Sequence, residues 1–187
     1  MPPKPAGADT PAVARAVAEL IRALGLDPAS EPELERTPER VADLYREIFA
    51  GLDPAGAPDL AVFPHPPAGG DELVVVRDIE FHSLCVHHFV PFFGRAHVAY
   101  LPGAQLVGIS GPARLVDRHA RRPQLQERMA RDIADDLERL LAPRGVAVTL
   151  VARHLCMEMR GIRRRAQVIT RVRRGALADP SWSTSLP

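Results

Sequence analysis

Two short motifs, far apart in the chain, contain its only two cysteines together with three of its histidines. The first motif is Cys85-Val86-His87-His88 and the second is His154-Leu155-Cys156. Cysteine thiolate and histidine imidazole are ligands that zinc prefers, and a Cys-x-x-His spacing lets both side chains reach one ion. Three protein ligands would leave a coordination position open for water, and the remaining histidines could then transfer protons. The motifs therefore predict a catalytic zinc site.

The same cysteines allow two simpler interpretations. They could form a disulfide, because their separation in space cannot be measured from the sequence, or they could be buried core thiols. No apolar signal segment follows Met1-Pro2-Pro3-Lys4, so we expect a cytoplasmic protein. In a reducing compartment, paired cysteines more often bind metal or take part in catalysis than form a bridge. This favours the metal site.

Length and charge limit the kinds of partner. The chain has 187 residues, with 24 Lys and Arg against 23 Asp and Glu, for a formal net charge of +1. This length suits a single core, and the near balance of charge argues against a nucleic-acid binder. No apolar run approaches the roughly 18 residues that a membrane span requires. We therefore expect neither nucleic acid nor a membrane as a partner.

Hydrophobic periodicity and turn residues divide the chain into segments. Two helices are predicted near the N-terminus, over residues 11–24 and from residue 37 to the stop at Gly51. The predicted organisation is a disordered N-terminus (1–10), a helical segment (11–52), a loop (53–71), a catalytic domain (72–175) and a flexible tail (176–187).

The predicted catalytic domain alternates strands and helices. A strand from residue 73 delivers Cys85 at its far end, and further strands are expected over 94–101, 146–158 and 166–173. In the strand 146–158, His154 and Cys156 would point to the same face. Helices are expected over residues 112–120 and 123–141. This order favours an α+β domain in which helices cover one face of an antiparallel sheet.

Residues 81–100, which read F-H-S-L-C-V-H-H-F-V-P-F-F-G-R-A-H-V-A-Y, closely resemble the zinc motif of GTP cyclohydrolase I. Three more blocks resemble that family in the same order: R-T-P-E-R-V at 36–41, R-R-P-Q-L-Q-E-R at 121–128, and H-L-C-M at 154–157 followed by Arg160-Gly161. The similarity runs from about residue 31 to residue 170. The chain is identified by these blocks as a member of the tunnelling-fold superfamily.

The resemblance implies a fold, an assembly and a reaction. Subunits of the family join their sheets into a ring, usually a decamer, with active sites at subunit boundaries. The reaction opens the guanine imidazole ring at C8, releases formate and converts GTP to 7,8-dihydroneopterin triphosphate. Matching the motifs implies that Cys85, His88 and Cys156 bind zinc and that His87, His154 and Ser110 are catalytic. It also implies that the substrate is bound by Glu127, Gln126, Arg114 and Arg160.

The sequence departs from the family at the phosphate end of the site. Gly111 stands where the family normally carries a lysine that helps to hold the triphosphate. This change leads to an alternative hypothesis, that the chain is a specialised paralogue that acts on a modified or less phosphorylated guanine nucleotide. Two further hypotheses are an NADPH-dependent nitrile reductase of the same fold, although no dinucleotide fingerprint is visible, and a non-catalytic ring that binds a pterin.

Overall fold

The computed structural model describes residues 9–27, 30–65 and 72–184. By its contacts the chain divides into two compact units, Met1–Ala57 and Pro58–Pro187. The first unit contains helices α1 (Thr10–Ala23) and α2 (Thr37–Ile48) and two 3-10 turns, η1 (Ala50–Leu52) and η2 (Pro54–Gly56). Both helices lie where the sequence predicts them.

Asp9 begins α1. Its carboxylate accepts a hydrogen bond from the backbone N–H of Ala12 at 3.0 Å, which satisfies one of the free donors at the helix start. Asp9 and Thr10 therefore belong to an ordered cap and helix, although they fall within the segment 1–10 predicted as disordered. The rest of that prediction, residues 1–8, lies outside the described residues.

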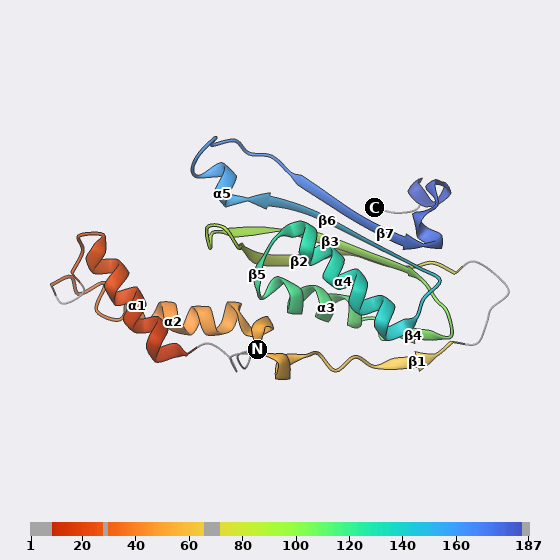
Figure 1. Ribbon diagram of the computed structural model, residues 1–187, viewed down its shortest axis with the longest axis horizontal. Coiled ribbons are helices and arrows are strands. Elements are labelled where there is room, and N and C mark those ends of the chain that lie inside the picture. The colour runs from red at the N-terminus through yellow and green to blue at the C-terminus, as the bar shows by residue number, and fades with distance from the viewer. Residues whose placement is uncertain (1–8, 28–29, 66–71, 185–187) are drawn as a thin grey trace, which may run out of the picture. The chain divides into compact units, whose positions relative to one another are not determined.

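The second unit is built on a five-stranded sheet, shown in Figure 1. The strand order is β5-β2-β3-β6-β7, and every neighbouring pair is antiparallel except the short parallel pair β2 and β5. The bounds are β2 Val74–Cys85, β3 Pro91–Leu101, β5 Pro123–Gln124, β6 Gly145–His154 and β7 Val168–Gly175. The predicted antiparallel α+β architecture is confirmed.

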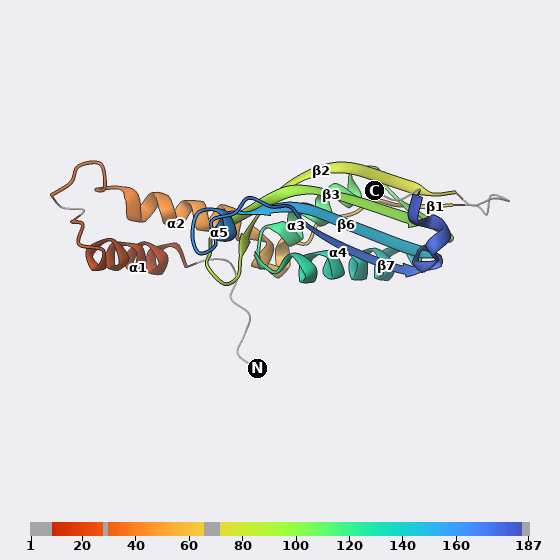
Figure 2. The ribbon, with the colours of Figure 1, turned by 90° about the horizontal axis from the view of Figure 1, so that it is seen from above.

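Helices α3 (Gly111–Ala120) and α4 (Gln126–Leu141) cover one face of this sheet (Figures 1 and 2). The apolar stripe of α4 at helical spacing, Met129, Ile133 and Leu137, is fully buried in a core that also contains Val98 and Val148 of the sheet. Burial of this stripe, rather than helix propensity, is what fixes α4 on the sheet. Among the described residues, no helix is long and apolar enough to span a membrane.

The segment predicted as a loop over 53–71 contains a strand. Strand β1 (Val62–Pro64) pairs with β4 (Gln105–Val107) in a separate two-stranded sheet. The 3-10 turn η2 also lies in this segment, and residues 66–71 are outside the described part of the chain. Sequence patterns missed β1 because three residues are too few to show alternation.

The sequence predicts a flexible tail from residue 176, but the structure has two 3-10 turns there, η3 (Ala176–Ala178) and η4 (Pro180–Thr184). Leu177 is fully buried against Leu101, and Trp182 packs against the same small cluster. This cluster lies on the face of the sheet opposite the main core, since Leu101 and Ala99 alternate with the inward-facing Tyr100.

The predicted helix over 123–141 begins too early. Pro123 and Gln124 instead form β5 beside Leu84 and Cys85 of β2, and α4 begins at Gln126. Proline has no N–H, so it is tolerated at the first residue of an edge strand as well as at a helix start.

The predicted strand over 146–158 is also wrong at its end. Strand β6 stops at His154, and residues Leu155–Glu158 form one helical turn, α5. The last residue of β6 to pair with β3 is His154, opposite Phe92, and β3 itself begins at Pro91. A longer β6 would have no partner strand for its backbone groups. Cys156 therefore lies on a helical turn and not on the same strand face as His154.

Candidate metal centre and active site

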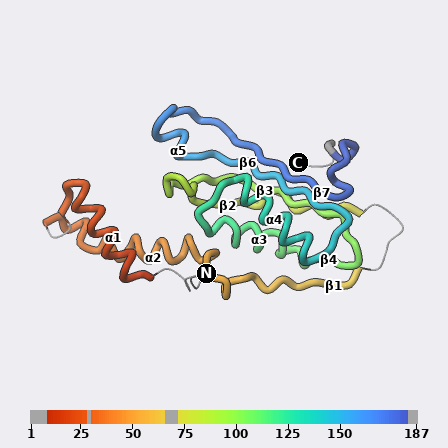
Figure 3. The backbone as a smooth tube through the Cα atoms, in the orientation of Figure 1, coloured from red at the N-terminus to blue at the C-terminus, as the bar shows by residue number. Residues whose placement is uncertain are grey.

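The first motif forms a tight turn at the end of β2 (Figure 3). The backbone N–H of Cys85 donates to the carbonyl of Val90 at 3.0 Å, and the N–H of Phe89 donates to the carbonyl of Cys85 at 2.8 Å. Phe89 adopts a φ of 54° to close the turn. Cys85 is buried, whereas His87 and His88 are exposed. The turn thus keeps the thiol inside and presents both imidazoles to solvent.

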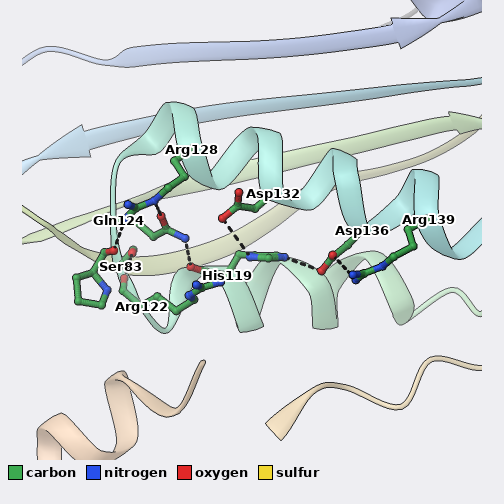
Figure 4. Close-up of polar contacts among 9 residues, drawn as sticks. Ser83, His119, Arg122, Gln124, Arg128, Asp132, Asp136 and Arg139 are labelled. Carbon is green, nitrogen blue, oxygen red and sulfur yellow. Dashed lines mark hydrogen bonds and ion pairs between the residues drawn. The ribbon is translucent and has the colours of Figure 1, made fainter. Parts of the chain in front are cut away.

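A network of polar side chains holds this turn against the start of α4 (Figure 4). The backbone N–H of Val86 donates to the carbonyl of Gln124 at 3.0 Å. The buried amide of Gln124 donates to the carbonyl of His119 at 3.0 Å and accepts from Nε of Arg128 at 2.8 Å. Arg128 also donates to the carbonyl of Pro123 at 2.6 Å. Because buried polar groups are costly without partners, this network fixes β5 beside Cys85.

The second motif is held by the turn α5, which lies at the same end of the sheet as the β2 turn (Figures 1 and 3). Arg153 makes two hydrogen bonds to the carboxylate of Glu158, of 2.8 and 2.5 Å. A bidentate pair of this kind is strong and directional. It ties the end of β6 to the end of α5 and so sets the position of Cys156 between them.

The two motifs meet in one cluster of possible metal ligands. Ligand atoms of Cys85, His88 and Cys156 all lie within 4.8 Å of one another. Sγ of Cys85 is 3.9 Å from Nδ1 of His88 and 3.7 Å from Nδ1 of His87. Both cysteines are free thiols, so the structure contains neither the disulfide nor two unrelated core thiols. The cluster matches the three ligands that the spacing and the resemblance predict.

The chemistry of this donor set fits a soft or borderline divalent cation. Burial and the neighbouring Cys85 raise the pKa of the Cys156 thiol, whereas the charge of Arg160 acts weakly in the opposite direction. A bound cation stabilises a coordinating thiol as the thiolate, which offsets this effect on Cys156. A Cys2His set suits zinc in a site with an open position. The residues present therefore fit the metal that the sequence predicts.

His154, the last residue of β6, lies beside the cluster in a fixed orientation. Its ring is stacked on Phe92, with ring centroids 4.6 Å apart and an interplanar angle of 2°. Its Nε2 lies 2.7 Å from Oε1 of Gln126. Burial lowers the pKa of His154, and the carboxylate of Glu127 partly offsets that effect. The imidazole is therefore held neutral near pH 7, in a state that can accept a proton.

Most of the predicted site residues gather at this end of the sheet. His87 is on the Cys85 turn, Glu127 is exposed in the first turn of α4 close enough to influence His154, and Nη1 of Arg160 lies 3.3 Å from Nε2 of His88. Gln126 was predicted to contact substrate. It is 2% exposed, and its amide points into the protein because it bonds to His154 and to two backbone carbonyls.

Ser110 and Arg114 are not brought to this cluster within the chain. They lie at the start of α3, next to β4, where Arg114 donates to the carbonyl of Asp59 at 3.4 Å. The other end of α3 leads through Arg121 to β5 and the Cys85 turn. A helix of 10 residues separates its ends by about 15 Å. One copy of the chain therefore presents the predicted site in two separate parts.

Sequence reasoning assigned no role to three residues that support the site. Phe92 supplies the surface on which His154 stacks, and Gln124 with Arg128 anchors the Cys85 turn. Strand pairing could have indicated Phe92, because it lies directly opposite His154. Gln124 and Arg128 lie in the block 121–128 that resembles the family, but residue type and spacing alone read both as polar positions in a predicted helix.

Known proteins with similar sequences agree on a single family. The model of the family described as GTP cyclohydrolase I matches residues 13–185. The chain is 46% identical over 178 residues to GTP cyclohydrolase 1 of Thermobifida fusca (strain YX). This alignment covers 94% of this chain and 84% of that protein. It is 50% identical over 169 residues to GTP cyclohydrolase 1 of Streptomyces avermitilis, covering 89% and 83% respectively.

A solved structure, titled the archaeosine synthase QueF-Like in the apo form, aligns with a TM-score of 0.44 and 20% identity over 55% of this chain and 94% of that one. This similarity is too low to support any argument.

An antiparallel sheet covered by two helices, with thiol and imidazole ligands gathered at one end, defines this protein as a tunnelling-fold enzyme of the hydrolase class. More particularly, the chain belongs to the GTP cyclohydrolase I family.

Proposed function

We propose that this enzyme opens the guanine imidazole ring of GTP at C8 by zinc-dependent hydrolysis, releases formate and forms 7,8-dihydroneopterin triphosphate. The observation that carries the proposal is the cluster of Cys85, His88 and Cys156, with the oriented base His154 beside it. The names of its relatives support the substrate.

Zinc held by Cys85, His88 and Cys156 would supply the Lewis acidity that makes water a strong nucleophile at neutral pH. His154 is neutral and can take up a proton released in the reaction. His87 is exposed on the same turn as Cys85, and we assign to it protonation of the ring nitrogen that leaves C8. Two histidines on different elements can thus act at different steps.

Glu127 is proposed to recognise the guanine base. Its carboxylate is exposed in the first turn of α4, and a carboxylate there can accept hydrogen bonds from the N–H edge of guanine in a paired geometry. Adenine lacks this pattern of donors, so it would leave the carboxylate unpaired. Arg160, which reaches the cluster from beyond α5, is proposed to contact phosphate.

The assembly proposed is a homo-oligomer, a decamer in which each active site spans a subunit boundary. Ser110 and Arg114 are separated from the metal cluster by the length of α3. If they contact ribose and phosphate, as the resemblance implies, they must do so in the site of a neighbouring copy. The nucleotide would then bridge two chains.

A second candidate is a paralogue that takes a guanine nucleotide with fewer phosphates or a modified base. The observation that favours it is the start of α3, where Ser110 is followed by Gly111 and Pro112. Neither residue offers a charged group, so one charge-assisted phosphate contact is missing. Arg114 and Arg160 remain available for the other phosphates.

A substrate panel with metal analysis tests these proposals. The zinc-loaded enzyme is assayed for formate release and pterin absorbance with GTP, GDP, GMP, guanosine and their 8-oxo forms. Fastest turnover of GTP supports the main proposal, whereas a preference for a shorter or modified nucleotide supports the second. Formate release by protein that contains no metal would overturn the zinc mechanism. NADPH-dependent reduction of a nitrile by metal-free protein would favour a nitrile reductase-like reaction. Absence of any turnover, with pterin binding retained, would favour a non-catalytic ring.

A further inference from the structure

Gln126 has a buried side-chain amide whose three hydrogen bonds determine which way it points. Its Nε2 lies 3.1 Å from the carbonyl oxygen of Leu150 and 2.9 Å from that of Val168. Both oxygens are acceptors only, so the group that faces them must be the NH2, which has one hydrogen for each. The reverse orientation would place three oxygens together with no hydrogen between them. Oε1 therefore faces His154.

This orientation dictates where His154 carries its hydrogen. Nε2 of His154 is 2.7 Å from Oε1 of Gln126, and that oxygen has no hydrogen to give, so Nε2 must be the donor. A neutral imidazole carries a single N–H, which leaves Nδ1 with a free lone pair. The stack on Phe92 fixes the plane of the same ring. A residue of α4 and a residue of β3 together determine both tautomer and orientation.

We propose that Gln126 is a positioning residue that holds the neutral His154 ring in the Nε2–H tautomer and leaves Nδ1 as its unprotonated nitrogen. The inference rests on the proposed role of His154 in proton transfer.

The first test is the 15N NMR spectrum of the zinc-loaded oligomer with labelled histidine, recorded by magic-angle spinning at about pH 8.5, two units above the ordinary histidine pKa. The His154 signals are assigned by their absence in His154→Ala. We expect a protonated Nε2 and an unprotonated Nδ1 in the native protein. In Gln126→Met, which has a similar volume but no acceptor oxygen, the two tautomers should mix.

The matched control is Gln124→Met. Gln124 is a neighbouring buried amide, 1% exposed, that also donates to a backbone carbonyl but does not contact His154. It should lose stability as Gln126→Met does and leave the His154 tautomer unchanged. This separates the loss of a buried amide from the loss of the bond to His154.

Kinetics provide the second test. Gln126→Met should lower kcat roughly ten- to a hundred-fold while KM changes little, because the amide does not reach the substrate. A raised KM with unchanged kcat, or a native tautomer in Gln126→Met, would overturn the inference. If the native enzyme releases no formate from any nucleotide, the proposed reaction fails, but the NMR comparison still decides what Gln126 does.

Discussion

The three residues proposed to bind zinc lie on backbone of different kinds. Cys85 ends a strand, His88 lies in a turn and Cys156 is part of a single helical turn. Each of these segments is fixed by its own hydrogen bonds. Donors that the fold holds in place lose less ordering entropy when they bind a metal, which strengthens binding.

The first prediction concerns the two cysteines. Cys85→Ala and Cys156→Ala should each lower bound zinc from about one per chain to a small fraction of that value, because two ligands are too few for a stable site. Activity should disappear together with the metal. Zinc is measured by plasma mass spectrometry on the gel-filtered protein. Met159→Ala, at an exposed side chain just after α5, is the matched control and should keep its zinc. Retained zinc in both cysteine variants would contradict the assignment.

The second prediction separates metal binding from proton transfer. His87→Ala should keep its zinc and lose roughly 10²- to 10⁴-fold in kcat, the usual contribution of a general acid. His82→Ala is the control, because His82 is another exposed histidine, on β2 just before the turn that carries His87. It stacks on Phe93, on the sheet face opposite to that of Cys85. The control variant should be nearly as active as the native enzyme. Full activity in His87→Ala would remove that residue from the mechanism.

At the scale of elements, the sequence predicts best those helices and strands whose apolar residues repeat at a regular spacing. The apolar positions expected on the helix 123–141 are Leu125, Met129, Ile133, Leu137 and Leu140. The middle three are fully buried, whereas Leu140 is partly buried and Leu125, which precedes α4, is 36% exposed. The end of β6 could not be predicted, because it depends on where β3 begins and on the ion pair between Arg153 and Glu158. Neither is visible in a window of local sequence.

Some residues of the candidate site could be predicted from the sequence and others could not. Residue type and spacing indicated the metal ligands, since few other roles need thiols and imidazoles so close together. The role of Gln126 could not be inferred, because the carbonyls that orient it are 24 and 42 positions away, on β6 and β7. A polar residue at the start of a helix reads as solvated until its tertiary partners are known.

The third prediction concerns the contact between α3 and α4. Nε2 of His119 donates to Asp136 at 2.8 Å, and Arg139 donates to the other oxygen at 2.6 Å (Figure 4). The hydrogen bond from His119 is the main reason that the pKa of Asp136 is lowered from its ordinary value of 3.8. The ionised carboxylate therefore stabilises the fold above that ordinary pKa. This contribution is lost as pH falls through the lower, folded-state pKa.

Asp136→Asn removes the charge but keeps an acceptor for His119. We expect it to lower the free energy of unfolding by about 1 kcal/mol at pH 7, the difference between the usual contributions of a hydrogen bond to a charged group and of one to a neutral group. The difference between variant and native protein should shrink as pH falls below about 4. Thermal unfolding at matched protein concentration measures both. A difference that is the same at pH 7 and in acid would show that the carboxylate charge has no part in holding the helices together.

At the scale of the whole molecule, the division of the predicted site gives the fourth prediction. Arg114 and Cys156 lie on parts of the chain separated by the length of α3. If each active site takes its metal cluster from one copy and its Arg114 from the next, two inactive variants can complement each other. Arg114→Ala and Cys156→Ala, each of low activity alone, should regain turnover when the two chains are co-expressed under different tags and purified as mixed rings.

The size of the recovery distinguishes the two arrangements. With random mixing in equal amounts, about one quarter of the sites combine an intact cluster with an intact Arg114 from the neighbouring chain, so mixed rings should show about a quarter of native activity. A site contained within one chain would gain nothing from mixing, since every chain would keep its own defect. Co-expression of Cys156→Ala with Cys85→Ala is the control, because both defects fall in the same cluster and no pairing of chains restores it. Recovery in the control as well as in the test pair would show that the apparent complementation comes from native contamination rather than from a shared site.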